Sequence, residues 1–189
     1  MRGEKIISPI EYKSNLYVLP GTLDLSALEI EIAAEPGREY ILKELLDKVK
    51  DRFEYIIIDC PPSLGLLTIN ALATADYVMI PLQAEYLALR GLAKLNDVIS
   101  KIQNRLNQKL QLGGVFLTHY DSRKILNRDV AGTVEEYFGN KFLKNKNSNN
   151  IALAEAPSKG MDIFSYNKSC KGAADYLNLV DELKKIGVF

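Results

Sequence analysis

Asp59 is the residue of this chain best placed to do chemistry. It follows an unbroken run of β-forming residues at 55–58 (YIII), a pattern typical of a strand buried on both faces of a parallel sheet. Such a strand would place the Asp59 carboxylate at the carboxyl edge of the sheet. There a phosphate-bound Mg²⁺ ion, or a water molecule in its shell, sits in nucleotide-binding α/β domains. A carboxylate that only caps the following helix gives the same pattern, so the residues alone leave both interpretations open.

The residues after Asp59 predict a stiff turn. Pro61 and Pro62 restrict two consecutive φ angles, and Ser63 is a residue type that starts helices. These features favour a loop that could report the presence of a γ-phosphate. Cys60 has no base near it in the sequence, which indicates a packing residue rather than a nucleophile.

Alternating strands and helices must position these residues. Apolar spacing predicts strands at 15–20, 55–58, 77–81 and 115–118, and helices at 23–34, 42–53, 64–74, 86–106, 126–138 and 173–186. We expect the last helix to turn four apolar residues inward, namely Tyr176, Leu177, Val180 and Leu183. The polar segment 141–150 (KFLKNKNSNN) is predicted to be a surface loop. The series predicts an α/β fold with three layers, α-β-α, a mostly parallel sheet, and a single domain over residues 1–189.

Composition excludes several classes of protein. The 24 basic and 24 acidic residues cancel, so contact with nucleic acid or an anionic membrane would need a local patch. Cys60 and Cys170 are far apart, and the sequence holds no Cys/His cluster for a zinc or iron–sulfur site. No stretch approaches the roughly 18 apolar residues of a membrane span. We therefore expect a cytoplasmic protein without a membrane partner.

Longer segments of the chain resemble a known family. The strings IIIDCPPSLG, LTINAL and VMIPLQAEYLALRGL follow one another, and the similarity extends from LYVLPGTLDLSALEIE to KGAADYLNL. In this order and spacing they resemble the ParA/Soj partition ATPases, deviant-Walker members of the MinD/ParA superfamily. The resemblance implies a P-loop NTPase-like fold, ATP and Mg²⁺ as ligands and an ATP-dependent homodimer. It also implies non-specific DNA binding on the nucleoid and a centromere-binding, ParB-like partner in plasmid or chromosome partitioning.

The resemblance also implies roles for residues near the nucleotide. Asp59 would be catalytic and would help to hold Mg²⁺ through a water molecule, and Pro61 and Pro62 would belong to the second switch loop. Thr118 and Asp121 would lie where the family holds the adenine base.

Macromolecular contacts follow from the same resemblance. Gln83 and Glu85 would lie near the dimer interface. The turn at 148–149 reads SN where relatives often carry arginine, which leaves Lys141, Lys144 and Lys146 for a weak, salt-sensitive DNA contact. The other interpretation of these lysines is a solvated loop.

One part of such an ATPase is absent from the sequence. A P-loop needs GxxxxGK[ST], whose backbone N–H groups and lysine hold the phosphates, and the chain contains no Gly-Lys dipeptide. In the family these residues precede the point where this sequence starts. The resemblance thus implies an incomplete fold without its first strand and P-loop. We expect no tight nucleotide binding and no ATPase from this chain alone. The alternative is a non-enzymatic dimerisation or interaction protein that kept the fold without the nucleotide.

Overall fold

The computed structural model describes residues 8–22, 24–61 and 63–189. They form two compact units. Unit 1 is the described part of Met1–Ala75 together with Arg105–Gln108, and unit 2 comprises Asp76–Asn104 and Lys109–Phe189. Each unit is described by itself below, and the prediction of a single domain stays a prediction.

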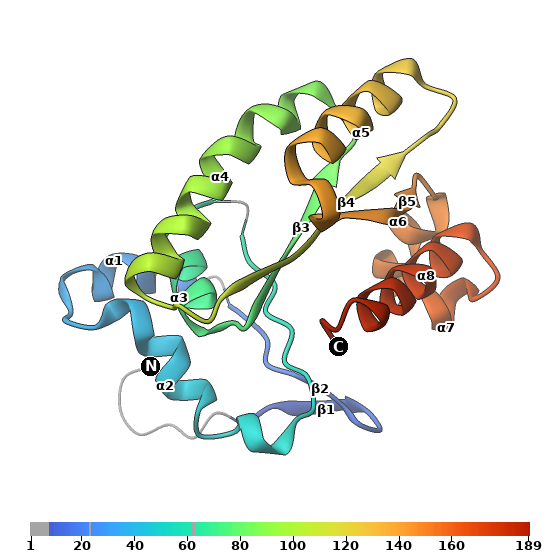
Figure 1. Ribbon diagram of the computed structural model, residues 1–189. Coiled ribbons are helices and arrows are strands. Elements are labelled where there is room, and N and C mark those ends of the chain that lie inside the picture. Colours follow the sequence, from blue (N-terminus) through green and yellow to red (C-terminus); the bar gives the residue numbers. More distant parts are fainter. Residues whose placement is uncertain (1–7, 23, 62) are drawn as a thin grey trace. The chain divides into compact units, whose positions relative to one another are not determined.

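Unit 1 combines a hairpin with short helices (Figure 1). Strand β1 (Ile10–Lys13) pairs antiparallel with β2 (Leu16–Val18). The helical elements that follow are α1 (Asp24–Glu31), η1 (Ile32–Ala34), η2 (Arg38–Tyr40), α2 (Ile41–Leu46), η3 (Lys50–Arg52) and α3 (Leu66–Thr74). The strand predicted at 15–20 is therefore present, but it is exposed along its length rather than buried, because a two-stranded hairpin has no second layer of its own.

Helix α3 is the centre of unit 1. Ala71, Leu72 and Ala73 are buried on it. The buried Asn70 accepts a hydrogen bond from the backbone N–H of Leu42 (3.0 Å) and donates to the carbonyl of Arg38 (2.8 Å). The helix predicted at 64–74 is confirmed. The helix predicted at 42–53 is shorter, because i→i+3 hydrogen bonds tighten the chain after Leu46 into turns.

Residues 55–58 do not form the predicted strand. No described strand pairs with this segment, and Tyr55, Ile56 and Ile57 are 51%, 41% and 84% exposed. A strand exists only where neighbouring backbone groups complete its ladder. The apolar run therefore indicates a preference for extended backbone, but it cannot provide the neighbouring strand that a sheet needs.

Unit 2 is built on a parallel sheet of three strands in the order β3-β4-β5 (Figure 1). The strands are β3 (Tyr77–Gln83), β4 (Gln111–Tyr120) and β5 (Phe142–Ser148), and the helices are α4 (Tyr86–Arg105), α5 (Ile125–Phe138), α6 (Ile151–Ser158), α7 (Ile163–Asn167) and α8 (Lys171–Lys185), with a 3-10 turn η4 (Gly139–Lys141). The strands predicted at 77–81 and 115–118 and the helices predicted at 86–106, 126–138 and 173–186 are confirmed. So is the α/β fold with a parallel sheet. Helices α6 and α7 were not predicted.

Strand β5 replaces the predicted surface loop at 141–150. Phe142 and Leu143 are buried, and carboxylates of α8 accept hydrogen bonds from the backbone of the strand. Glu182 accepts from the N–H groups of Lys144 (2.7 Å) and Asn145 (2.8 Å). These contacts come from residues distant in sequence, so the polar composition of the segment could not predict them.

Helix α8 covers one face of the sheet, where Leu179 and Leu183 pack with Phe116 and Leu143. Leu183 faces inward as predicted. The other three expected positions are exposed, at 38% for Tyr176, 53% for Leu177 and 37% for Val180. The helix is instead turned so that the polar Asp175 is buried with Leu179 and Leu183, because hydrogen bonds from the end of β5 hold that carboxylate inward.

Candidate functional site

The predicted site residues are divided between the units. Asp59 and Pro61 belong to unit 1, whereas Gln83, Thr118 and Asp121 belong to unit 2; Pro62 lies outside the described residues. The Asp59 carboxylate is exposed and does not terminate a paired strand. Its role in holding Mg²⁺ therefore stays a prediction.

The loop after Asp59 is anchored at the amino end of α3. Gly65 is the N-cap residue and supplies no side chain. Glu29 of α1 takes that place, since its Oε1 accepts from the N–H of Leu67 (3.2 Å). The hydroxyl of Thr68 donates to the carbonyl of Ser63 (2.6 Å), so Ser63 contributes its backbone rather than the predicted cap. A carboxylate at a helix amino end is stabilised by the helix dipole, which makes Glu29 an anchor that the sequence did not reveal.

A Cβ atom at Gly65 would lie 2.3 Å from Oε1 of Glu29. The glycine is therefore what allows this carboxylate to approach the helix end. Cys60 lies on the same loop. Its pKa is raised, first by partial burial of the sulfur and second by the charge of Asp59, so the thiol is poorly suited to act as a nucleophile.

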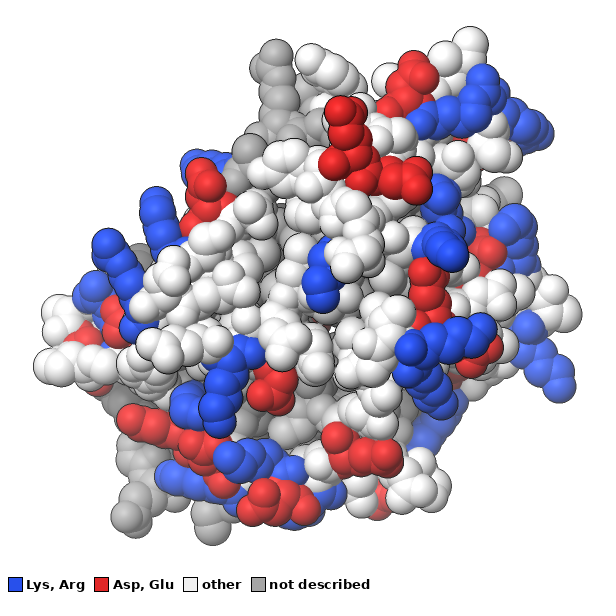
Figure 2. Space-filling view, in the orientation of Figure 1, with Lys and Arg blue, Asp and Glu red and all other residues white. Residues whose placement is uncertain are grey.

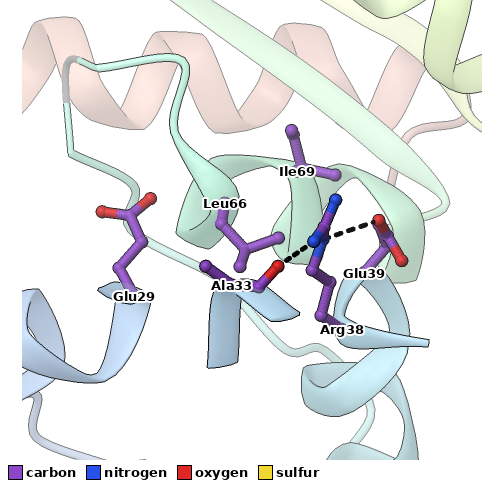
Figure 3. A pocket seen from close by; sticks show the side chains of 6 residues that line it. All are labelled: Glu29, Ala33, Arg38, Glu39, Leu66 and Ile69. Carbon is purple, nitrogen blue, oxygen red and sulfur yellow. Dashed lines mark hydrogen bonds and ion pairs between the residues drawn. The ribbon is translucent and has the colours of Figure 1, made fainter. Parts of the chain in front are cut away.

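A pocket of about 300 Å³ lies beside this anchor in unit 1. Figure 3 shows Glu29 on one side and Arg38 with Glu39 on the other, with Leu66 and Ile69 between them. The Arg38 guanidinium is already engaged, by the Glu39 carboxylate (3.2 Å) and by the Ala33 carbonyl. None of the predicted site residues lines this pocket.

The ends of β3 and β4 bring two predicted residues together in unit 2. Gln83 and Thr118 are register partners at the last rung of the parallel ladder. Just beyond it, the Ala84 N–H donates to the Thr118 carbonyl (3.2 Å). The next residue, His119, adopts a left-handed φ of 53°. The predicted dimer loop and the predicted adenine loop are thus neighbours at the carboxyl edge of the sheet.

Asp121, predicted to lie near the adenine base, is already paired. Arg123 donates from Nε to Oδ1 (2.9 Å) and from Nη2 to Oδ2 (2.8 Å), and its backbone N–H also reaches Oδ1 (3.0 Å). The side-chain hydrogen bonds from Arg123, followed by its backbone N–H, hold the pKa of the Asp121 carboxyl well below its usual range. The carboxylate therefore orders its own loop.

Asn127 of α5 joins the same two loops and was not predicted. It is 5% exposed. Its Nδ2 donates to the carbonyl of Ala84 (2.6 Å), and its Oδ1 accepts from the N–H of Asp121 (2.8 Å). A single asparagine inside an amphipathic helix gives no sequence signal, because only the fold decides which backbone groups it meets.

The predicted DNA-contacting lysines lie in or beside β5. Lys141 and Lys144 are exposed. The Lys146 ammonium lies over the rings of Tyr120 (5.6 Å) and Phe142 (5.2 Å), so this side chain is partly committed to packing. Figure 2 shows basic and acidic side chains interspersed on the visible face, without a broad basic field.

Comparison with known proteins places these features in context. A family model described as an AAA domain matches residues 2–112. The chain is 46% identical over 169 residues to the chromosome-partitioning ATPase Soj of Treponema pallidum (strain Nichols), covering 89% of this chain and 67% of that protein. It is also 46% identical over 173 residues to the sporulation initiation inhibitor protein Soj of Bacillus subtilis (strain 168), covering 92% of this chain and 68% of that protein.

Solved structures share the fold. Cobyrinic acid a,c-diamide synthase from Mycobacterium smegmatis, with bound ADP and magnesium, matches with a TM-score of 0.73 and 36% sequence identity, over 88% of this chain and 61% of that one. The chain spans about two thirds of the length of the two Soj proteins named above.

No helix among the described residues is long and apolar enough to cross a membrane.

Proposed function

Because this chain belongs to the ParA/Soj family of partition ATPases, we propose that it acts in plasmid or chromosome segregation as a nucleotide-dependent switch. The observation that carries the proposal is the 46% identity over 169 residues to a chromosome-partitioning ATPase. The fold supports it, because ligands of open parallel sheets bind beyond the carboxyl ends of the strands. Gln83, Thr118 and Asp121 lie at those ends.

The proposed ligands are ATP and Mg²⁺. The related mycobacterial structure was solved with ADP and magnesium. Asp59 would offer one carboxylate to the metal through a water molecule, beside Pro61 and Pro62. No group of three acidic, His or Cys side chains among the described residues could hold a metal, so phosphate oxygens would have to complete the shell, as is usual for Mg²⁺.

The adenine base would meet the loop from Thr118 to Asp121. Because Arg123 already engages both oxygens of the Asp121 carboxylate, this loop would offer the base its backbone groups and the Thr118 hydroxyl. Asp121 would then act as the residue that keeps the loop in shape.

We expect the 189-residue chain to bind MgATP weakly and not to hydrolyse it. Its sequence contains no GxxxxGK[ST] string, so the residues present lack the backbone cradle and the lysine that position and stabilise a phosphoryl group in transfer. No hydrolytic step is assigned to them. The alternative function, a dimerisation or interaction protein that works without nucleotide, draws support from the exposed apolar side chains of Tyr55, Ile56 and Ile57.

Macromolecular partners are part of the proposal. Gln83 and Glu85, both exposed, would lie at a homodimer interface, and a ParB-like protein would be the regulatory partner in the cytoplasm. DNA binding would be weak and non-specific. If Lys141, Lys144 and Lys146 each contact one phosphate, a plot of log K against log salt concentration would have a slope of about −2 to −3.

A chimera tests the nucleotide switch. The matching part of Treponema pallidum Soj is replaced by this chain, and MgATP binding and hydrolysis are measured for the chimera, for Soj and for the 189-residue chain. We expect the chimera to bind and hydrolyse ATP, and Asp59→Ala in it to reduce turnover by roughly 100-fold or more. Asp181→Ala, on the exposed face of α8, is the matched control. A folded chimera that forms dimers without binding MgATP would favour the interaction protein.

A further inference from the structure

The loops that follow β3 and β4 are held by one buried side chain. Asn127 uses both ends of its amide, Nδ2 on the carbonyl of Ala84 (2.6 Å) and Oδ1 on the N–H of Asp121 (2.8 Å). These two backbone groups lie on different loops. The loop of Ala84 carries the residues predicted for the dimer interface, and the loop of Asp121 carries those predicted for the adenine base. Asn127 itself stands on a third element, α5.

Burial makes this bridge rigid. Ala84 is 1% exposed and Asn127 is 5% exposed, so water is poorly placed to replace either partner. A buried carbonyl or N–H that loses its partner is strongly destabilised. Separating the two loops would therefore remove a hydrogen bond from the buried Ala84 carbonyl.

The bridge also lies where the sheet no longer connects the loops. The ladder between β3 and β4 ends at the pair Gln83 and Thr118, with one further bond from the Ala84 N–H to the Thr118 carbonyl. The next residue, His119, has a left-handed φ of 53°, and beyond Thr118 β4 has no register partner on β3. At Asp121, Asn127 connects the chain back to the loop after β3.

We propose that Asn127 is a positioning residue that couples the loop at Thr118–Asp121 to the loop at Gln83–Glu85. The assignment of these loops to adenine and to the dimer interface rests on the proposed function. The coupling itself does not. A shift at Asp121 moves its N–H against Oδ1 of Asn127, and the same planar amide passes the change to the carbonyl of Ala84. Coupling of this kind acts equally in both directions.

Amide hydrogen exchange of the nucleotide-free chain tests the bridge. Asn127→Ala should raise exchange at the amides of Asp121 and Glu85 by about tenfold beyond the change in global stability, the factor expected for one lost hydrogen bond. The matched control is Asn70→Ala, because Asn70 is 4% exposed and also joins separate backbone segments, but in unit 1. In Asn70→Ala, the amides of Asp121 and Glu85 should exchange at the rate that the change in global stability alone predicts. A uniform rise in both variants would overturn the proposal.

A second variant tests the transmission. Arg123 is 89% exposed, and Arg123→Ala removes its two side-chain donors to Asp121 without disturbing a buried group. The Glu85 amide, which donates to the Gln83 carbonyl (2.7 Å), should change its exchange rate and chemical shift in this variant. In an Asn127→Ala background, Arg123→Ala should change the exchange rate and chemical shift of the Asp121 amide but not those of the Glu85 amide. The coupling would be refuted if the Glu85 amide is unchanged in Arg123→Ala alone, or if it responds equally in the natural and the Asn127→Ala backgrounds. The first of these outcomes can be measured even if Asn127→Ala does not fold. Since no nucleotide is added, a failure of the proposed function leaves this result untouched.

Discussion

Asp175 of α8 holds the end of β5, and its replacement tests why a polar segment becomes a strand. It is 5% exposed and accepts hydrogen bonds from the N–H of Ser148 (2.8 Å), from the hydroxyl of the same residue and from Lys171 Nζ (2.8 Å). A hydrogen bond to a charged acceptor contributes about 1.5–3 kcal/mol. The Lys171 side chain is 66% exposed, so its ion pair adds only about 0.3–0.5 kcal/mol.

Asp175→Ala should therefore lower the free energy of unfolding by about 2–3.5 kcal/mol, because the N–H of Ser148 loses its acceptor. Asp175→Asn keeps one acceptor oxygen and should lose roughly half as much. Urea denaturation measures both. Asp181→Asn, on the exposed face of the same helix, is the control and should stay within about 0.5 kcal/mol of the natural chain.

The same carboxylate predicts a pH dependence. Burial alone would raise the pKa of Asp175, but hydrogen bonds from Lys171 and Ser148, with the lysine charge, outweigh it and lower the pKa below its ordinary value of 3.8. A carboxyl whose pKa is lower in the folded state contributes stability that is complete above its unfolded pKa and is lost as pH falls through the folded value. The difference between the natural chain and Asp175→Asn should thus be constant above about pH 5 and shrink below about pH 4. A difference that stays constant into strong acid, or one no larger than that of Asp181→Asn, would refute this account.

Two further predictions concern close contacts. Glu29→Ala should lower the free energy of unfolding by about 1 kcal/mol through loss of the acceptor at the amino end of α3, and Glu29→Gln by less. Equal losses in urea denaturation would show that the charge is irrelevant there. Gly114→Ala would bring a Cβ to 2.9 Å from the Leu143 side chain and should cost about 1–3 kcal/mol. Gly132→Ala in α5, where a Cβ meets nothing within 4 Å, should instead stabilise by up to about 1 kcal/mol. Thermal melts that move in the same direction for both glycine variants would contradict this contrast.

Elements with a local signal were predictable from the sequence alone. Helices α4 and α5 repeat apolar residues along one face, and α3, β3 and β4 are mostly apolar runs between turns. Such patterns are determined by neighbours along the chain, which is why their positions and the α/β class could be predicted. The family relationship was predictable for a similar reason, since it depends on motifs in a fixed order.

The partners of each segment were decided only by the tertiary structure. A strand is a property of a pair of segments. The β-forming run at 55–58 therefore forms no strand with the described residues, whereas the polar segment 142–148 becomes β5, whose backbone N–H groups donate to carboxylates of α8. The same applies to the site. Asp59 and Asp121 could be singled out by type and position, but Glu29 and Asn127 gain their meaning from backbone groups 38 and 43 residues away. Hydrogen bonds and burial between distant segments carry no local pattern, and they are what position the loops of this protein.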